Sequence, residues 1–198
     1  MNALRNSGLR YGIVAMAFHW AIAAFVLVNL GLGLYMSDLP RSDASRFMLY
    51  QLHKSVGLTV LVLSILRLVW RVANPIPPMP QGLHPLLGFA GRAVHFLLYF
   101  LIVSIPLVGW AMVSSSPIGL PTPYFGLFAW PNIAFFAHQP TASKMAYEDL
   151  FHDTHALLAY SALALIALHV LAALYHQFGR RDDVLARMLP GARVSDPA

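Results

Sequence analysis

The sequence has no cysteine in its 198 residues. This excludes disulfides, iron–sulfur clusters, thiolate zinc sites, covalently attached c-type haem and cysteine nucleophiles. Charged side chains are also scarce, at 11% of the chain against about 25% in soluble domains. Hydrophobic residues reach 58%, which is more than a soluble chain of this length can bury. The composition therefore predicts an integral membrane protein and excludes a disordered chain.

Clustered positive charge is also missing. The formal net charge is +5, but the basic residues are scattered along the chain, whereas nucleic-acid-binding proteins gather Lys and Arg on a patch or stripe. We therefore expect membrane lipid, and no nucleic acid, among the partners of this chain.

Four apolar stretches are long enough to cross a bilayer as helices, which requires about 20 residues each. They cover approximately residues 11–36, 49–72, 88–114 and 147–178. The first is too long for the apolar core of a cleaved signal peptide, which has about 7–15 residues. We predict an all-α four-helix membrane bundle that forms a single domain over residues 1–198. A polar tail is expected from about residue 182, and the connection over 115–147, rich in proline and aromatic residues, is expected at the membrane interface or capping the bundle.

The basic residues predict the orientation of the bundle. The side with both termini and the second connection carries nine of them: Arg5, Arg10, Arg67, Arg71, Arg92, Arg180, Arg181, Arg187 and Arg193. The opposite side carries four: Arg41, Arg46, Lys54 and Lys144. Because Lys and Arg are enriched in cytoplasmic loops, we expect both termini in the cytoplasm.

Nine histidines are the unusual feature of so apolar a chain. His155 and His169 are 14 residues apart in the fourth span, which in a helix is about 40° short of whole turns and about 21 Å of rise. Their rings therefore share one side of the helix at two depths. Depth then pairs His155 with His53 near the outer side, and His169 with His19 near the inner side.

Two stacked imidazole pairs in a helical bundle suit two six-coordinate b-type haems, because each iron takes a nitrogen ligand on both faces. Zinc or non-haem iron would need three or four converging ligands and carboxylates, and no carboxylate lies deep in a span. Packed or interfacial histidines are the alternative, although an ionisable group inside a span is a functional hypothesis by default. We expect His95 to be packed or interfacial. His152, one turn before His155, is the alternative outer ligand, but the register of His155 with His169 favours His155.

Four further residues are candidate cofactor or substrate contacts. Arg67 and Arg71 end the second span at the depth of the inner pair, where they would bind haem propionates or act as cytoplasmic anchors. Lys54, beside His53, presents the same alternatives at the outer pair. His176 follows His169 by seven residues, and would hydrogen-bond a quinone carbonyl or lie at the interface.

Four segments carry a family resemblance over residues 10–180: Phe18-His19-Trp20, His53-Lys54-Ser55-Val56-Gly57 with Arg67 and Arg71, Ile105-Pro106-Leu107-Val108-Gly109, and His155 with His169. With them the chain resembles the bacterial cytochrome b561 family, which is related to the cytochrome b subunits of nickel hydrogenases and formate dehydrogenases. The resemblance implies a multi-pass protein of the bacterial inner membrane. It also implies two haems held by His19/His169 and His53/His155, and electron exchange with quinone, ubiquinone being the expected substrate.

The resemblance leaves the electron donor open. One branch of the family oxidises superoxide at the periplasmic face, so superoxide:ubiquinone oxidoreductase is the sharpest expectation. The outer side, however, has only four basic residues and carries five acidic ones: Asp38, Asp43, Glu148, Asp149 and Asp153. They form no evident positive funnel, which argues against superoxide as the substrate. The long aromatic connection would instead dock a periplasmic redox partner or only shield the outer haem. The alternative function is a cytochrome b subunit that anchors a soluble dehydrogenase or hydrogenase. A haem-free transporter would need intramembrane carboxylates and broken helices.

Overall fold

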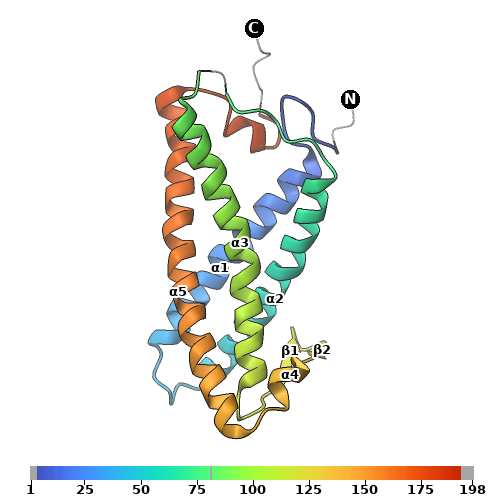
Figure 1. Ribbon diagram of the computed structural model, residues 1–198, viewed down its shortest axis with the longest axis vertical. Helices are drawn as coiled ribbons and strands as arrows, with labels where there is room; N and C mark the ends of the chain where they lie inside the picture. Colours follow the sequence, from blue (N-terminus) through green and yellow to red (C-terminus); the bar gives the residue numbers. More distant parts are fainter. Residues whose placement is uncertain (1–3, 81, 193–198) are drawn as a thin grey trace.

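The computed structural model describes residues 4–80 and 82–192 and contains four helices long and apolar enough to cross a membrane. These are α1 (Ile13–Asp38), α2 (Ser45–Val72), α3 (Pro85–Ser115) and α5 (Thr141–Leu174). All four extend lengthwise between the two ends of the molecule, and α1 is inclined to α5 (Figure 1). The predicted four-helix membrane bundle is confirmed. Arg193 and the rest of the predicted tail beyond residue 192 lie outside the described residues.

The helices pack as two pairs. α1 packs against α2 and α3 packs against α5, and a contact between α2 and α3 joins the pairs. α2 and α3 each hold six of the buried positions, whereas Ala162 is the only buried residue of the 34 in α5. Many large apolar side chains of α1, α3 and α5 are exposed on the outside of the bundle, as expected for helices whose surroundings are lipid.

One end of the bundle, here called the hairpin end, is covered by the long connection between α3 and α5. Strands β1 (Thr122–Tyr124) and β2 (Phe128–Trp130) form an antiparallel hairpin, and the short helix α4 (Ala134–Ala137) follows. Phe125 and Gly126 both have positive φ, at 48° and 76°, as a tight hairpin turn requires. The Ser55 hydroxyl in α2 accepts a hydrogen bond from the Phe125 N–H at 3.0 Å, so the hairpin is docked on α2. The connection therefore caps the bundle, but the two strands were not predicted.

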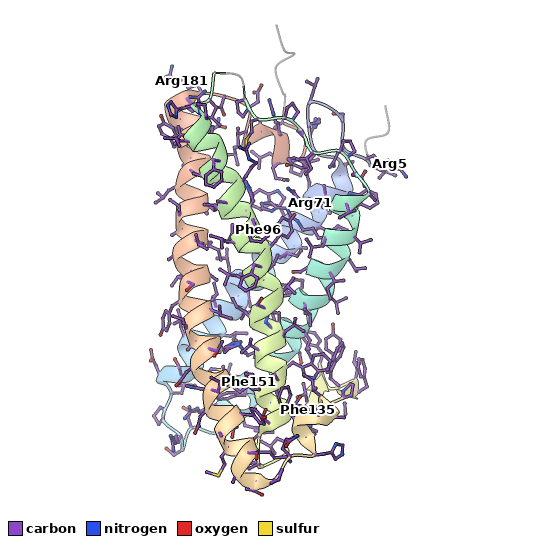
Figure 2. The ribbon with its side chains drawn as sticks, viewed as in Figure 1. Arg5, Arg71, Phe96, Phe135, Phe151 and Arg181 are labelled. Carbon is purple, nitrogen blue, oxygen red and sulfur yellow. The ribbon has the colours of Figure 1, made fainter. Side chains whose placement is uncertain are left out.

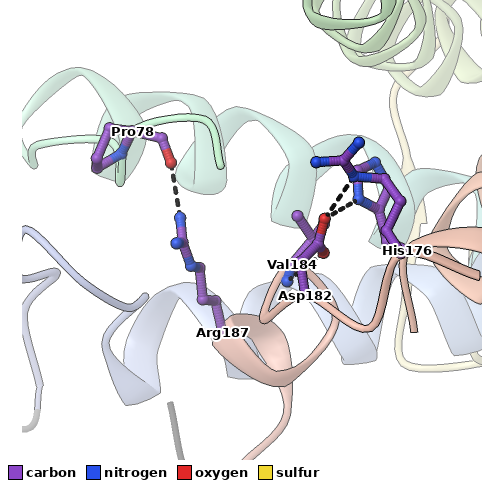
Figure 3. A network of polar contacts seen from close by, with 6 residues as sticks. Pro78, His176, Asp182, Val184 and Arg187 are labelled. Atoms are coloured by element: carbon purple, nitrogen blue, oxygen red, sulfur yellow. Dashed lines mark hydrogen bonds and ion pairs between the residues drawn. The ribbon is translucent and has the colours of Figure 1, made fainter. Parts of the chain in front are cut away.

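The opposite end, here called the terminal end, is crossed by residues 4–12 and 182–192. α5 continues as a π-helical turn, η1 (Tyr175–Arg180), after which the chain reverses into the 3₁₀ helix η2 (Ala186–Met188). The indole N–H of Trp20 donates to the Met188 carbonyl at 2.9 Å. The guanidinium of Arg187 donates to the Pro78 carbonyl at 2.6 Å (Figure 3). The described part of the predicted tail is therefore folded over the bundle.

The two ends differ in chemistry. Figure 2 shows Arg5 and Arg181 at the terminal end and Arg71 in the half of the bundle nearest to it, whereas Phe135 and Phe151 lie toward the hairpin end. This distribution follows the charge asymmetry of the sequence.

Candidate functional site

The outer pair of histidines comes together near the hairpin end. The ring centres of His53 in α2 and His155 in α5 are 6.1 Å apart, and the ring planes are inclined by 72°. The His155 Nδ1 donates a hydrogen bond to the Ile105 carbonyl in α3 at 3.0 Å. That bond orients the ring and leaves its Nε2 free to act as a ligand.

Each ring of the outer pair lies against a glycine of a neighbouring helix. A Cβ placed on Gly109 would be 3.0 Å from the Cε1 of His155, and one on Gly33 would be 3.3 Å from the Cε1 of His53. One turn before Gly109, the Ile105 carbonyl accepts the hydrogen bond from His155. The Nδ1 of His53, by contrast, is buried without a hydrogen-bond partner among the described residues. Glycine at these two positions lets the imidazoles lie directly on the neighbouring helices.

The inner pair lies in the half of the bundle nearer the terminal end, with a third imidazole beside it. The ring centres of His19 in α1 and His169 in α5 are 6.3 Å apart, with an interplanar angle of 73°. His95 in α3 is closer still to His169, at 5.2 Å, and its Nδ1 bonds to the Gly91 carbonyl at 2.7 Å. The structure thus brings together the two pairs of histidine rings that were predicted from their depth in the membrane spans. It also adds His95, whose position in the inner half of the third span was the only signal in the sequence.

Two guanidinium groups lie beside the inner histidines. The Arg67 Nε donates to the Tyr99 hydroxyl at 2.9 Å, and Arg71 lies over the same ring, 5.2 Å from its centre. Arg67 is near enough to His19 and His169 to act on them electrostatically. Among the described residues, neither arginine forms an ion pair with a carboxylate. The inner site therefore carries unneutralised positive charge.

Two other candidates have local partners near the hairpin end. The ammonium of Lys54 donates to the Pro121 carbonyl at 3.2 Å, which ties α2 to the segment before β1. The His152 side chain is 71% exposed and pairs with Asp153 at 3.2 Å, so the structure does not bring it to His53.

The imidazole of His176 is held by a carboxylate at the terminal end. Its Nδ1 lies 2.8 Å from the Asp182 carboxylate (Figure 3). The same carboxylate also accepts a hydrogen bond from the Arg180 Nε at 3.0 Å. Burial alone would raise the pKa of Asp182, but the hydrogen bonds from His176, Arg180 and the Val184 N–H hold that pKa below its usual value. Asp182 is therefore a carboxylate at neutral pH.

Comparison with known proteins identifies the family of this histidine-containing four-helix bundle. The family model of prokaryotic cytochrome b561 matches residues 10–191. The chain belongs to this family. It is 35% identical to "Cytochrome b561 homolog 2" of Escherichia coli K12 over 191 residues, covering 96% of each chain. It is 27% identical to "Probable superoxide oxidase CybB" of Yersinia pestis over 186 residues, covering 93% of this chain and 98% of the relative.

Membership of the cytochrome b561 family gives the chain its general role. It is a multi-pass protein of the bacterial inner membrane that binds haem b and transfers electrons. The resemblance inferred from the four sequence segments is thereby confirmed at the level of the family.

Proposed function

We propose that this cytochrome carries electrons across the inner membrane through two b haems, between a periplasmic redox partner and the quinone pool. The observation that carries the proposal is the pair of facing imidazole sets, His19 with His169 and His53 with His155, at two depths of one bundle. Haem iron with two imidazole ligands supplies one-electron chemistry and leaves no coordination position open. The protein supplies ligands, spacing and the surrounding charge.

The spacing of the rings supports this assignment. An imidazole nitrogen would bind a metal ion at about 2.0–2.1 Å, as for zinc, and the ring centre is about 1.1 Å beyond the nitrogen. Two imidazoles that held one metal ion between them would therefore have ring centres about 6.2–6.4 Å apart. The two pairs have separations of 6.1 and 6.3 Å. The hydrogen bond that the Nδ1 of His155 donates to the Ile105 carbonyl leaves Nε2 as the available nitrogen.

The arginines support the assignment at the inner pair. Haem carries two carboxylates, and Arg67 and Arg71 are adjacent cations that share Tyr99 and have no described carboxylate partner. Guanidinium–carboxylate pairs are strong where water is scarce. We therefore assign Arg67 and Arg71 to the propionates of the inner haem. Lys54 already bonds to a backbone carbonyl, so we assign it to holding the connection over the outer haem.

His95 is assigned a supporting place beside the inner haem. Its ring centre is 5.2 Å from that of His169, against 6.3 Å for His19, and its Nδ1 bonds to the Gly91 carbonyl of its own helix. A His95→Gln change should leave two haems bound and shift only the spectrum or midpoint potential of the inner one. Loss of that haem would make His95 a ligand instead.

The direction of the chain in the membrane follows from charge. The terminal end carries most of the basic residues, so we place it in the cytoplasm, with the hairpin end facing the periplasm. Ubiquinone is the proposed electron acceptor or donor at the cytoplasmic side, with His176 as a hydrogen-bonding contact to its carbonyl. Superoxide is the proposed periplasmic donor, because a relative is named a probable superoxide oxidase.

Haem stoichiometry in paired variants tests the ligands. A pyridine haemochrome assay should find two haems per chain in the native protein and one in either His169→Ala or His53→Ala. Reduced-minus-oxidised spectra should show that different haems are lost. A single haem in the native protein, or two in either variant, would contradict the assignment.

Activity of the purified protein tests the substrates. The chain in lipid vesicles should reduce ubiquinone when superoxide is generated outside, and superoxide dismutase should abolish the reaction. If quinone reduction needs a copurifying catalytic subunit instead, the chain is the membrane anchor of a larger dehydrogenase or hydrogenase.

A further inference from the structure

The connection between α3 and α5 has no charged side chain before α5 begins. No Lys, Arg, Asp or Glu occurs between Arg92 and Lys144, so this connection is as free of charge as the membrane-spanning part of α3. The other connection at the hairpin end, between α1 and α2, is different, because Asp38, Arg41 and Asp43 lie within or beside it. The two connections therefore suit different surroundings.

The hairpin of this connection lies on the outside of the bundle. Figure 1 shows β1 and β2 beside the helices, short of the level at which α3 ends. The two α2 residues that bond to the hairpin, Ser55 and Thr59, are about 160° and 120° around the helix from His53. Because the His53 ring faces His155 inside the bundle, the hairpin packs on the opposite side of α2.

The contacts along α2 show how far the hairpin extends inward. Ser55 and Thr59 follow His53 by two and six residues, which is about 3 and 9 Å along a helix. The Ser55 hydroxyl donates to the Pro123 carbonyl at 3.1 Å, and the Thr59 hydroxyl bonds to that of Tyr124 at 3.0 Å. The hairpin therefore reaches past the level of the outer histidines toward the middle of the bundle.

The charges of α5 give a scale for this depth. The Asp153 side chain is 87% exposed, and no Lys, Arg, Asp or Glu follows it before Arg180. Asp153 precedes His155 by two residues, so the contacts of the hairpin with α2 are about 6–12 Å inward of this last charge. The hairpin therefore lies beside the apolar part of the spans.

The backbone of the hairpin is suited to apolar surroundings, where every polar backbone group needs a partner within the protein. Pro121 and Pro123 have no N–H, and their carbonyls accept hydrogen bonds from side chains of α2. The N–H groups of Phe125 and Leu127 are bonded as well, to α2 and within the turn. The two strands pair with each other.

We propose that the hairpin is inserted into the membrane leaflet at the hairpin end, with Leu127 and Phe128 against lipid acyl chains. These side chains are 77% and 52% exposed, and they continue the apolar outer surface of the membrane-spanning helices. Trp110 and Trp130, with ring centres 6.0 Å apart, lie where the hairpin leaves α3, and tryptophan is enriched at membrane interfaces. The hairpin thus covers α2 beside the outer histidine pair, and lipid covers the hairpin.

The test uses the absence of cysteine from the chain. Leu127→Cys and Phe128→Cys are made in the full haem-loaded protein, which is placed in nanodiscs of phosphatidylethanolamine and phosphatidylglycerol. Each thiol is labelled in parallel with a neutral maleimide and with a sulfonated, membrane-impermeant thiol reagent, and the ratio of the two rates is measured. Because a charge is costly inside a bilayer, the charged-to-neutral ratio of both variants should be at least about tenfold below that of Asp153→Cys.

Two further variants calibrate the measurement. Leu157→Cys is on α5, two residues inward of His155, with a side chain that is 68% exposed, and its ratio should match that of Leu127→Cys. Ile118→Cys is the matched control within the connection, because Ile118 is also 77% exposed but lies just beyond the end of α3. Its ratio should match that of Asp153→Cys.

Two results would overturn the proposal. If Leu127→Cys has the same ratio as Asp153→Cys, the hairpin lies in water. If its thiol is protected in native membranes but reacts freely in nanodiscs, a protein partner rather than lipid covers the hairpin. Normal labelling by the neutral reagent, with haem content equal to that of the native protein, shows that a low ratio does not arise from burial within a misfolded chain.

Discussion

The contact between Gly109 and His155 allows the outer haem site to be tested with one substitution, Gly109→Ala, which adds a single methyl group beside the His155 ring. Gly109 lies inside α3, where alanine is favoured over glycine by about 1 kcal/mol. Gly109→Ala should therefore not weaken the helix itself. Its effect should come from the new Cβ, which would be 3.0 Å from the Cε1 and 3.2 Å from the Nδ1 of His155.

The size of the effect follows from these distances. Carbon atoms in contact prefer about 3.5–4.0 Å, so the ring must move by roughly 0.5 Å or more. Coordination distances tolerate only about ±0.2 Å, and changes in the groups that orient a ligand typically cost about 10–100-fold in metal affinity. We expect the outer haem to be bound at least tenfold more weakly, which is about 1.4 kcal/mol.

The assay is haem stoichiometry combined with a redox titration of the purified variant. Gly109→Ala should lose or shift only the outer haem. Gly33→Ala, with its Cβ 3.3 Å from the His53 Cε1, should show a smaller shift. Gly31→Ala, on the same helix with nothing within 4 Å of the new Cβ, is the matched control and should behave as the native protein. Two haems with native potentials in Gly109→Ala would refute the reasoning.

Three further predictions concern the residues around the site. Tyr99→Phe removes the acceptor of the Arg67 hydrogen bond and should weaken retention of the inner haem by about 1 kcal/mol or more; an unchanged rate of haem transfer to an apo-acceptor protein would contradict this. Ser55→Ala leaves the Phe125 N–H without its acceptor, so docking of the hairpin should weaken by about 1–3 kcal/mol. Limited proteolysis within residues 116–132 should then be faster than in a Ser161→Ala control. Because the folded pKa of Asp182 lies below its usual value, its contribution to stability is complete above the unfolded pKa of about 3.9 and is lost as pH falls through the lower folded value. Hydrogen exchange in residues 182–192, corrected for intrinsic rates, should increase only in that acidic range, and equal protection at pH 7 and pH 3 would exclude the effect.

Several features were readable from the sequence because they depend on local geometry. The spans follow from the length of uncharged stretches, and α5 differs most, beginning at Thr141 rather than near 147. Its first turns carry Lys144 and Glu148, which resemble a connection in composition but are good helix formers in water. The pairing of histidines by depth also follows from local geometry, because the rise per residue of a helix is constant.

Other features depend on how the helices are rotated and where the connections run. His95 was expected to be packed or interfacial, and only the packing of α3 on α5 brings it to His169. The contact of His155 with Gly109 and the docking of the hairpin on Ser55 are of the same kind.

Composition and helical periodicity determined that this chain spans the membrane four times and holds two histidine levels, because bilayer thickness and helical rise impose them on any such sequence. Tertiary structure alone decided that Asp182 returns to His176 and that glycines receive the outer rings. Those contacts join residues whose separation in the chain carries no information about their distance in space.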